Sequence, residues 1–188
     1  MWLPREAPTI VIMELLLSLQ KLERRLFHRV FQQTERRMVI PLARAVSHSG
    51  DGYLHLLVPL LVWSLDPQRF ALLLPLLALS LACERVVYWM LKNTLRRPRP
   101  QDSVPGFRSL INASDQFSFP SGHSSGAFLL ATCLLLVYGG SAAPMLLWAC
   151  AVALSRVLLG VHFPGDTLAG ALMGGGIALL VAHTLGLG

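Results

Sequence analysis

Long apolar runs separated by short polar segments dominate the chain. Four of these runs are long enough, or nearly so, to cross a bilayer whose hydrocarbon core is about 30 Å thick. They cover residues 70–91, 121–138, 144–163 and 166–187. A fifth run at 53–65 is short unless it takes in residues of the preceding segment AVSHSGDG. The pattern predicts an all-α, multi-pass transmembrane bundle of about five spans, with residues 1–188 forming a single membrane-embedded domain.

The segment at 9–37 has the spacing of an amphipathic helix. Its apolar residues recur at steps of three and four: Leu15, Leu19, Leu22, Leu26 and Val30. The opposite face carries Lys21, Arg24, Arg25, His28 and Gln32. This pattern favours a helix that lies in the membrane surface, with its basic side toward anionic lipid head groups. A helix packed on the protein's own core, with a solvated basic face, is the alternative.

The composition agrees with a membrane protein. Hydrophobic residues make up 54% of the chain, charged residues only 14%, and the mean hydropathy is +0.56. Such a chain is too apolar for an ordinary soluble domain, so we expect a lipid partner and no nucleic acid. Cys83, Cys133 and Cys150 all lie within apolar runs. They are therefore interpreted as core or lipid-facing residues and not as a disulfide framework or a metal site.

Three polar clusters stand at the ends of apolar runs. The first is Lys92 with Arg99 in KNTLRRPRP, the second is Ser121-Gly122-His123, and the third is SRVLLGVHFPGD with Ser155, Arg156, His162 and Asp166. Counting the membrane crossings between them places all three clusters on the same face of the membrane. The sequence therefore predicts one site built from the region 92–166.

These residue types suit a phosphate group. Lys92, Arg99 and Arg156 can bind its oxygens, and Ser121 with the backbone N–H groups of Gly122 and His123 can complete the cradle. Asp166 follows His162 closely enough to orient its ring, which favours His162 as the nucleophile and His123 as the general acid.

Two other acidic positions receive structural interpretations. Asp51, in the turn SHSGDG, is interpreted as a helix cap. Glu84 lies beside Arg85 near the end of a run, where the two charges can pair with neighbours or reach the membrane surface. No close group of His, Cys and carboxylate residues indicates a metal ion.

The three clusters resemble a known signature. KNTLRRPRP fits K-x6-R-P, PSGH fits the second part, and SRVLLGVHFPGD fits S-R-x5-H-x3-D. Together they are similar to the signature of the type 2 phosphatidic acid phosphatase superfamily, which also includes the vanadium haloperoxidases. The apolar runs agree with its membrane lipid phosphatases, many of which have six spans. The short form, with SGDG before the first span and FSFPSGH, looks more like the polyprenyl diphosphate phosphatase branch.

The resemblance implies a helical core and hydrolysis through a phosphohistidine, without a metal or another cofactor. It implies His162 as nucleophile, Asp166 as its partner and His123 as acid. The phosphate binders that it implies are Lys92, Arg99, Ser121, Gly122 and Arg156. The expected substrate is a polyprenyl diphosphate such as undecaprenyl diphosphate, with phosphatidate or phosphatidylglycerophosphate as the alternative. An anion transporter or a catalytically inactive lipid-binding relative remains open as a different class.

The charge distribution bears on the orientation in the cell membrane. Eight cationic residues precede the first span, and three more lie in the loop that belongs to the site: Arg5, Lys21, Arg24, Arg25, Arg29, Arg36, Arg37 and Arg44, then Arg96, Arg97 and Arg108. The opposite face has only Arg69. The positive-inside rule therefore favours a cytoplasmic site. Many bacterial relatives that act on polyprenyl diphosphates work on the periplasmic face, so that side remains the alternative.

Overall fold

The computed structural model describes residues 7–32, 34, 38–113 and 115–187, and the regular structure in these residues is entirely helical. The elements in chain order are α1 (Ala7–Gln32), α2 (Val39–Ser49), α3 (Leu54–Leu65), α4 (Pro67–Leu95), α5 (Pro100–Ser103), α6 (Gly122–Tyr138), the short 3₁₀ helix η2 (Gly139–Ala142), α7 (Pro144–Leu158) and α8 (Pro164–Thr184). The predicted all-α class is confirmed.

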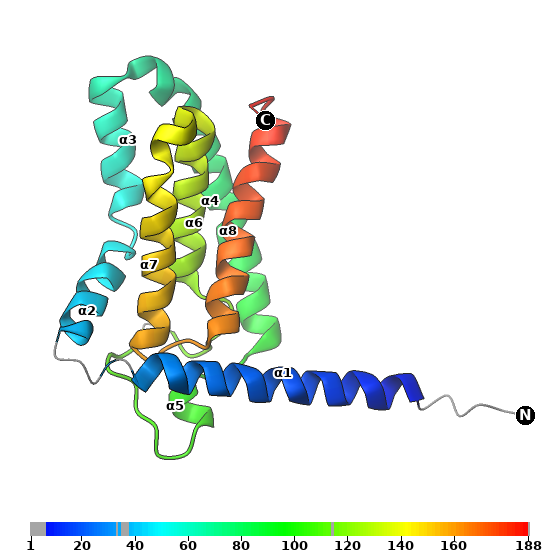
Figure 1. Cartoon of the computed structure of the whole chain (residues 1–188). Coiled ribbons are helices and arrows are strands. Elements are labelled where there is room, and N and C mark those ends of the chain that lie inside the picture. The colour runs from blue at the N-terminus through cyan, green and yellow to red at the C-terminus, as the bar shows by residue number, and fades with distance from the viewer. Residues whose placement is uncertain (1–6, 33, 35–37, 114, 188) are drawn as a thin grey trace, which may run out of the picture.

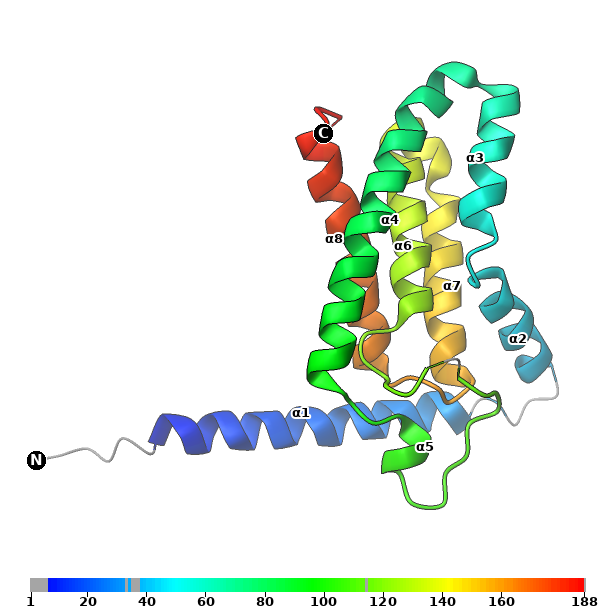
Figure 2. The same ribbon diagram turned by 180° about the vertical axis from the view of Figure 1, so that it is seen from behind.

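Five apolar helices, α3, α4, α6, α7 and α8, run along one another in a bundle (Figures 1 and 2). Helix α6 packs against α4, α7 and α8 and so lies at the centre. Leucines such as Leu76 and Leu129 are fully buried in the core between these helices. Outward-facing leucines and tryptophans on the same helices stay exposed, as lipid-facing side chains of a membrane bundle do.

Three segments are long and apolar enough to cross a membrane: α4, α6 with its continuation η2, and α8. The other two, α3 with 12 residues and α7 with 15, are shorter apolar helices than the roughly 20 residues that a full crossing needs. The transmembrane helical bundle is therefore confirmed. Of the five predicted spans, three have full spanning length in the described residues.

Local sequence signals set the helix ends around the polar clusters. Helix α6 begins where the sequence predicted it, with Ser121 at the N-cap accepting a hydrogen bond from the backbone N–H of Ser124. Helix α7 ends at Leu158, earlier than the predicted run, because Gly160 adopts a φ of +76° that a helix cannot continue through. His162 therefore lies in a short loop between α7 and α8.

The segment before the first apolar run forms a separate helix, α2, which packs against α7. A turn over residues 50–53 then leads into α3. Gly50 is required in this turn because a Cβ atom there would lie 2.8 Å from Cγ1 of Val152. The interpretation of Asp51 as a helix cap is wrong: the N-cap of α3 is Tyr53, and no side chain caps it. Asp51 has other partners, described below.

Helix α1 lies across the end of the bundle where α4 ends and α8 begins (Figures 1 and 2). Phe27 is fully buried there against the rings of Phe107 and Phe163. Leu22 and Leu26 of the predicted apolar stripe are 52% and 40% exposed. The bundle is thus contacted mainly through Phe27, and of the predicted stripe Val30 packs against the same cluster. Residues 33 and 35–37 of the predicted segment lie outside the described residues, and its contact with lipid stays a prediction.

Helices α6 and α8 approach each other closely at two glycines. A Cβ atom on Gly170 would lie 2.4 Å from the backbone oxygen of Ser121, and one on Gly174 would lie 2.0 Å from that of Ser125. Small residues permit such backbone contact between membrane helices. The contact holds the first turn of α8, with Asp166, beside the first turn of α6, with His123.

We expect Gly174→Ala to destabilise the bundle because its methyl group would displace backbone, an overpacking that costs about 1–3 kcal/mol. Gly176→Ala is the matched control, since nothing lies within 4 Å of a Cβ atom there. Thermal unfolding in detergent should show a lower midpoint for Gly174→Ala and an unchanged or higher one for Gly176→Ala. Equal midpoints for the two variants would contradict the close packing of α6 and α8.

Candidate active site

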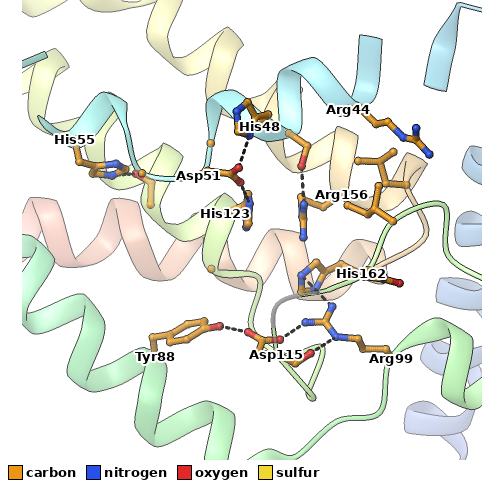
Figure 3. Close-up of a pocket in the computed structure, with 18 of the residues that line it drawn as sticks. Arg44, His48, Asp51, His55, Tyr88, Arg99, Asp115, His123, Arg156 and His162 are labelled. Atoms are coloured by element: carbon orange, nitrogen blue, oxygen red, sulfur yellow. Dashed lines mark hydrogen bonds and ion pairs between the residues drawn. The ribbon is translucent and has the colours of Figure 1, made fainter. Parts of the chain in front are cut away.

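A cavity of about 870 Å³ opens near the α1 end of the bundle, between the start of α6, the end of α7, α2 and α4. Of the eight residues that the sequence singles out, five line it: Arg99, Gly122, His123, Arg156 and His162 (Figure 3). The other three, Lys92, Ser121 and Asp166, are buried behind its wall. The structure thus brings all three polar clusters to one place.

His162 is buried in the loop between α7 and α8. Its Nδ1 atom lies 3.7 Å from Oδ2 of Asp166, and its Nε2 atom lies 3.5 Å from a guanidinium nitrogen of Arg99 at the cavity. Burial lowers the pKa of His162 below its ordinary value, which keeps the ring neutral at pH 7. A neutral imidazole with a nitrogen toward the cavity can act as a nucleophile.

Asp166, in the first turn of α8, is held by several donors. Its Oδ2 atom accepts a hydrogen bond of 2.8 Å from the backbone N–H of Phe163, and its Oδ1 atom lies 2.7 Å from a guanidinium nitrogen of Arg97. Arg97 also pairs with Glu23 of α1 at 2.5 Å, and Glu23 accepts a bond of 2.9 Å from the N–H of Gly165. The N-terminal helix is therefore linked to the carboxylate behind His162.

Four arginines line the cavity: Arg44, Arg85, Arg99 and Arg156. Arg99 donates a hydrogen bond of 2.6 Å to the backbone oxygen of Val161, and Arg156 donates one of 2.6 Å to the hydroxyl of Ser47 on α2. Among the described residues, the buried Nε atom of Arg156 has no hydrogen-bond partner. Because a buried donor without a partner is costly, this atom is suited to an anionic ligand.

Sequence reasoning missed Asp115, which lies between Tyr88 and Arg99 at the cavity (Figure 3). Its carboxylate lies 2.9 Å from Nζ of Lys92, pairs with the guanidinium of Arg99, and accepts a bond of 2.7 Å from the hydroxyl of Tyr88. Although burial opposes it, the bonds from Lys92 and Tyr88 lower the pKa of Asp115 to about 2. A single acidic residue in an irregular loop carries no periodic signal that could have indicated this role.

The start of α6 supplies backbone donors. The hydroxyl of Ser121 serves as the helix cap, while Gly122 and His123 line the cavity. The first N–H groups of a helix have no partner within it and favour an anion. A Cβ atom on Gly122 would lie 3.1 Å from the ring of Tyr88, so glycine keeps this helix end close to α4.

His123 has a carboxylate partner that its sequence neighbours do not reveal. Its Nε2 atom lies 2.6 Å from Oδ1 of Asp51, and Oδ2 of Asp51 lies 2.5 Å from Nδ1 of His48 (Figure 3). The fold brings the turn after α2 against the start of α6, 72 residues later.

Glu84 and Arg85 pair with each other, one of the two arrangements expected for them. Glu84 is fully buried and accepts bonds of 2.5 and 2.7 Å from Arg85 and one of 2.7 Å from the hydroxyl of Ser125. Arg85 borders the cavity. Among the described residues, no group of three or more His, Cys, Asp and Glu side chains could hold a metal ion.

Comparison with known proteins places this geometry in context. The chain is 36% identical over 122 residues to the putative undecaprenyl-diphosphatase YbjG of Escherichia coli, covering 63% of this chain and 59% of that protein. It is 31% identical to the lipid A 4'-phosphatase of Bacteroides thetaiotaomicron, covering 50% of this chain and 45% of that one. The chain thus spans about half the length of these curated relatives.

Two solved structures share the fold. LpxE of Aquifex aeolicus gives a TM-score of 0.72 at 24% identity, over 86% of this chain and 95% of that one. A transmembrane PAP2 type phosphatidylglycerolphosphate phosphatase from Bacillus subtilis gives 0.70 at 23% identity, over 90% of this chain and 87% of that one. The profile of the PAP2 superfamily matches residues 71–186, which include every residue of the three polar clusters. The chain therefore belongs to the PAP2 superfamily.

Proposed function

We propose that the protein is an integral-membrane lipid phosphatase that removes the terminal phosphate of a polyprenyl diphosphate, such as undecaprenyl diphosphate, without a metal ion. The observation that carries the proposal is the buried ring of His162, whose Nε2 atom lies 3.5 Å from Arg99 at a cavity that Arg156 also lines. The names of the relatives support a lipid phosphate as the substrate class.

In the proposed reaction, Nε2 of His162 attacks the terminal phosphorus while His123 protonates the leaving oxygen. Arg99, Arg156 and Lys92 stabilise the charge on the transferring group. The lipid leaves as its monophosphate and the phosphoryl group stays on His162. Water then attacks the phosphohistidine, His123 takes the proton from the water, and inorganic phosphate is released. Asp166 stabilises the positive charge that His162 acquires.

The test is phosphate release by detergent-solubilised protein from three lipids: undecaprenyl diphosphate, phosphatidate and phosphatidylglycerophosphate. We expect the highest kcat/KM on the diphosphate, with turnover that survives EDTA. His162→Ala should abolish release, a loss larger than the roughly 10²–10⁴-fold effect of a general acid or base. His183→Ala is the control, because His183 is exposed at the far end of α8.

The other outcomes are equally informative. Faster release from phosphatidate or phosphatidylglycerophosphate would replace the proposed substrate with the alternative. No release from any lipid, with phosphate still bound, would favour an anion-binding or inactive relative. Release by folded His162→Ala protein would refute the nucleophile, and a strict magnesium requirement would refute the metal-independent mechanism.

Asp115 must be displaced when a phosphate binds Lys92 and Arg99, since its carboxylate already pairs with both. We expect Asp115→Asn to bind inorganic phosphate or vanadate about tenfold more tightly, because the neutral amide competes less for the cations. Titration calorimetry at pH 7 measures this, where Asp115 with a pKa of about 2 is fully ionised. Weaker binding by Asp115→Asn would show that the carboxylate organises the cations and does not compete with the ligand.

We also propose that the site faces the cytoplasm. The described cations that the sequence analysis counted on the site's face belong to elements at or near the α1 end of the bundle: Lys21, Arg24, Arg25, Arg29, Arg44, Arg96, Arg97 and Arg108. Arg69 lies at the start of α4, at the other end. The excess of positive charge at the α1 end of the bundle supports a cytoplasmic location of the site. The exposed Leu22 and Leu26 support a contact of α1 with the membrane surface on that side.

Single cysteines in a background lacking Cys83, Cys133 and Cys150 test the orientation. Asp102→Cys, exposed on α5, marks the site end, and Ser141→Cys, exposed on η2, marks the opposite end. A membrane-impermeant thiol reagent applied to intact spheroplasts should label only Ser141→Cys, and permeabilisation should expose Asp102→Cys. The reverse pattern would place the site on the periplasmic face.

A further inference from the structure

Two histidines that line the cavity each have a carboxylate beside them, but a different ring nitrogen is nearest the carboxylate in each case. In His162 the nitrogen nearest the carboxylate is Nδ1, and Nε2 is directed to the cavity side at Arg99. In His123 the nitrogen bound to the carboxylate is Nε2, which leaves Nδ1 as the second nitrogen of the ring. The carboxylate of the first pair belongs to the known sequence cluster, whereas Asp51 of the second pair comes from a distant turn.

We propose that Asp51 is a positioning residue for the general acid: it holds Nε2 of His123 so that the ring delivers its proton from Nδ1 to the leaving oxygen. This inference rests on the proposed phosphatase function and deepens it. Asp51 does not touch the transferring phosphate and acts only through His123.

The turn that carries Asp51 is fixed against the ring. A Cβ atom on Gly50 would lie 3.5 Å from Cδ2 of His123 and 2.8 Å from Cγ1 of Val152. The backbone of the turn is thus packed between α6 and α7, with no room for a side chain at that position. Because Asp51 follows directly, its carboxylate has little freedom to leave the ring.

The hydrogen bonds to Asp51 determine which ring nitrogens of the two histidines carry a proton. An ionised carboxylate only accepts, so Asp51 requires an N–H at both imidazole atoms that it contacts. These atoms are Nε2 of His123 at 2.6 Å and Nδ1 of His48 at 2.5 Å. His123 therefore keeps a proton on Nε2 throughout, and the proton that it transfers is the one on Nδ1. His48 fixes the second carboxylate oxygen from the end of α2.

Asp51 also affects the charge of the His123 ring. The charged groups that line the cavity with His123 include Arg156 from α7, Asp115 from the loop before α6, and Asp51 from the turn after α2. A nearby cation opposes a positive ring, whereas a nearby carboxylate favours it. Asp115 is engaged with Lys92 and Arg99. Asp51 is thus the carboxylate in direct contact with the ring, and it stabilises the imidazolium that a general acid must be.

A purely structural role for Asp51 makes a different prediction from a role through the acid. A general acid raises the rate most when the alcohol is a poor leaving group. It raises the rate little when the alcohol leaves as a stable anion. Loss of a structural contact would slow all substrates alike. The dependence of the rate on the leaving group therefore separates the two roles.

The experiment compares wild type, Asp51→Asn and His123→Ala on detergent-soluble phosphate monoesters whose leaving groups range from p-nitrophenol to an alkanol. We expect Asp51→Asn to lower kcat/KM by about 10²-fold for the alkyl ester, and by only a few-fold for p-nitrophenyl phosphate. His123→Ala should show the same trend with a larger loss. Asp102→Asn, an exposed change on α5, should leave the whole series unchanged.

A measurement that needs no turnover accompanies this series. Nitrogen NMR of histidine-labelled protein, with His123 assigned from its substitution, reports which ring nitrogen carries the proton. We expect a hydrogen-bonded Nε2–H on His123 in wild type and in Asp102→Asn, and its loss in Asp51→Asn. An inactive wild type would refute the proposed phosphatase function, while the NMR result would still decide the Asp51 contact. Equal slowing of every ester, or a His123 ring without a proton on Nε2, would overturn the inference.

Discussion

The backbone contact between α6 and α8 is the constraint on which the site depends. At Gly170 and Gly174 the backbones of the two helices are in direct contact. A side chain at either position would overlap the backbone oxygen of Ser121 or Ser125. A hydrogen bond of 3.0 Å from the N–H of Ser121 to the backbone oxygen of Asp166 then joins the starts of the two helices. The proposed nucleophile and the proposed acid are placed relative to each other by main-chain contacts, which are stiffer than side-chain contacts.

Positive charge concentrated at the end of an apolar bundle needs negative partners. Lys92, Arg99 and Arg97 have such partners, supplied by other parts of the chain. Asp115 from the loop before α6 pairs with Lys92 and Arg99, while Glu23 from α1 and Asp166 from α8 pair with Arg97. The same carboxylates tie loops and the N-terminal helix to the bundle, so charge compensation and loop anchoring are performed by the same residues.

The parts of this structure that follow from periodicity could be predicted. Apolar runs located the five bundle helices, and the parity of crossings indicated that Lys92, His123 and His162 meet at one end. Turn chemistry located the start of α6 at Ser121. The end of α7 was misplaced, since a single Gly160 with positive φ ended the helix inside an apolar run.

Single residues in irregular segments could not be predicted. Asp51 and Asp115 sit in turns whose sequence has no period, and their partners lie far away along the chain. The docking face of α1 was missed for a related reason. One fully buried aromatic residue, Phe27, marks the side of the helix that contacts the bundle, while Leu22 and Leu26 of the predicted stripe stay exposed. The packing of a few large aromatic rings therefore determines the contact face of this helix more strongly than the apolar periodicity of its sequence.

The position of α1 across the bundle end has a consequence for how substrate arrives. Phe27 of α1 packs on Phe163, the neighbour of His162 in sequence, so the loop that carries the proposed nucleophile lies against α1. In the proposed placement of α1 along the bilayer surface, this contact would set the loop near the depth of the lipid head groups. A lipid can then present its head group while its tail stays in the hydrocarbon layer, and substrate capture becomes a two-dimensional search within the membrane.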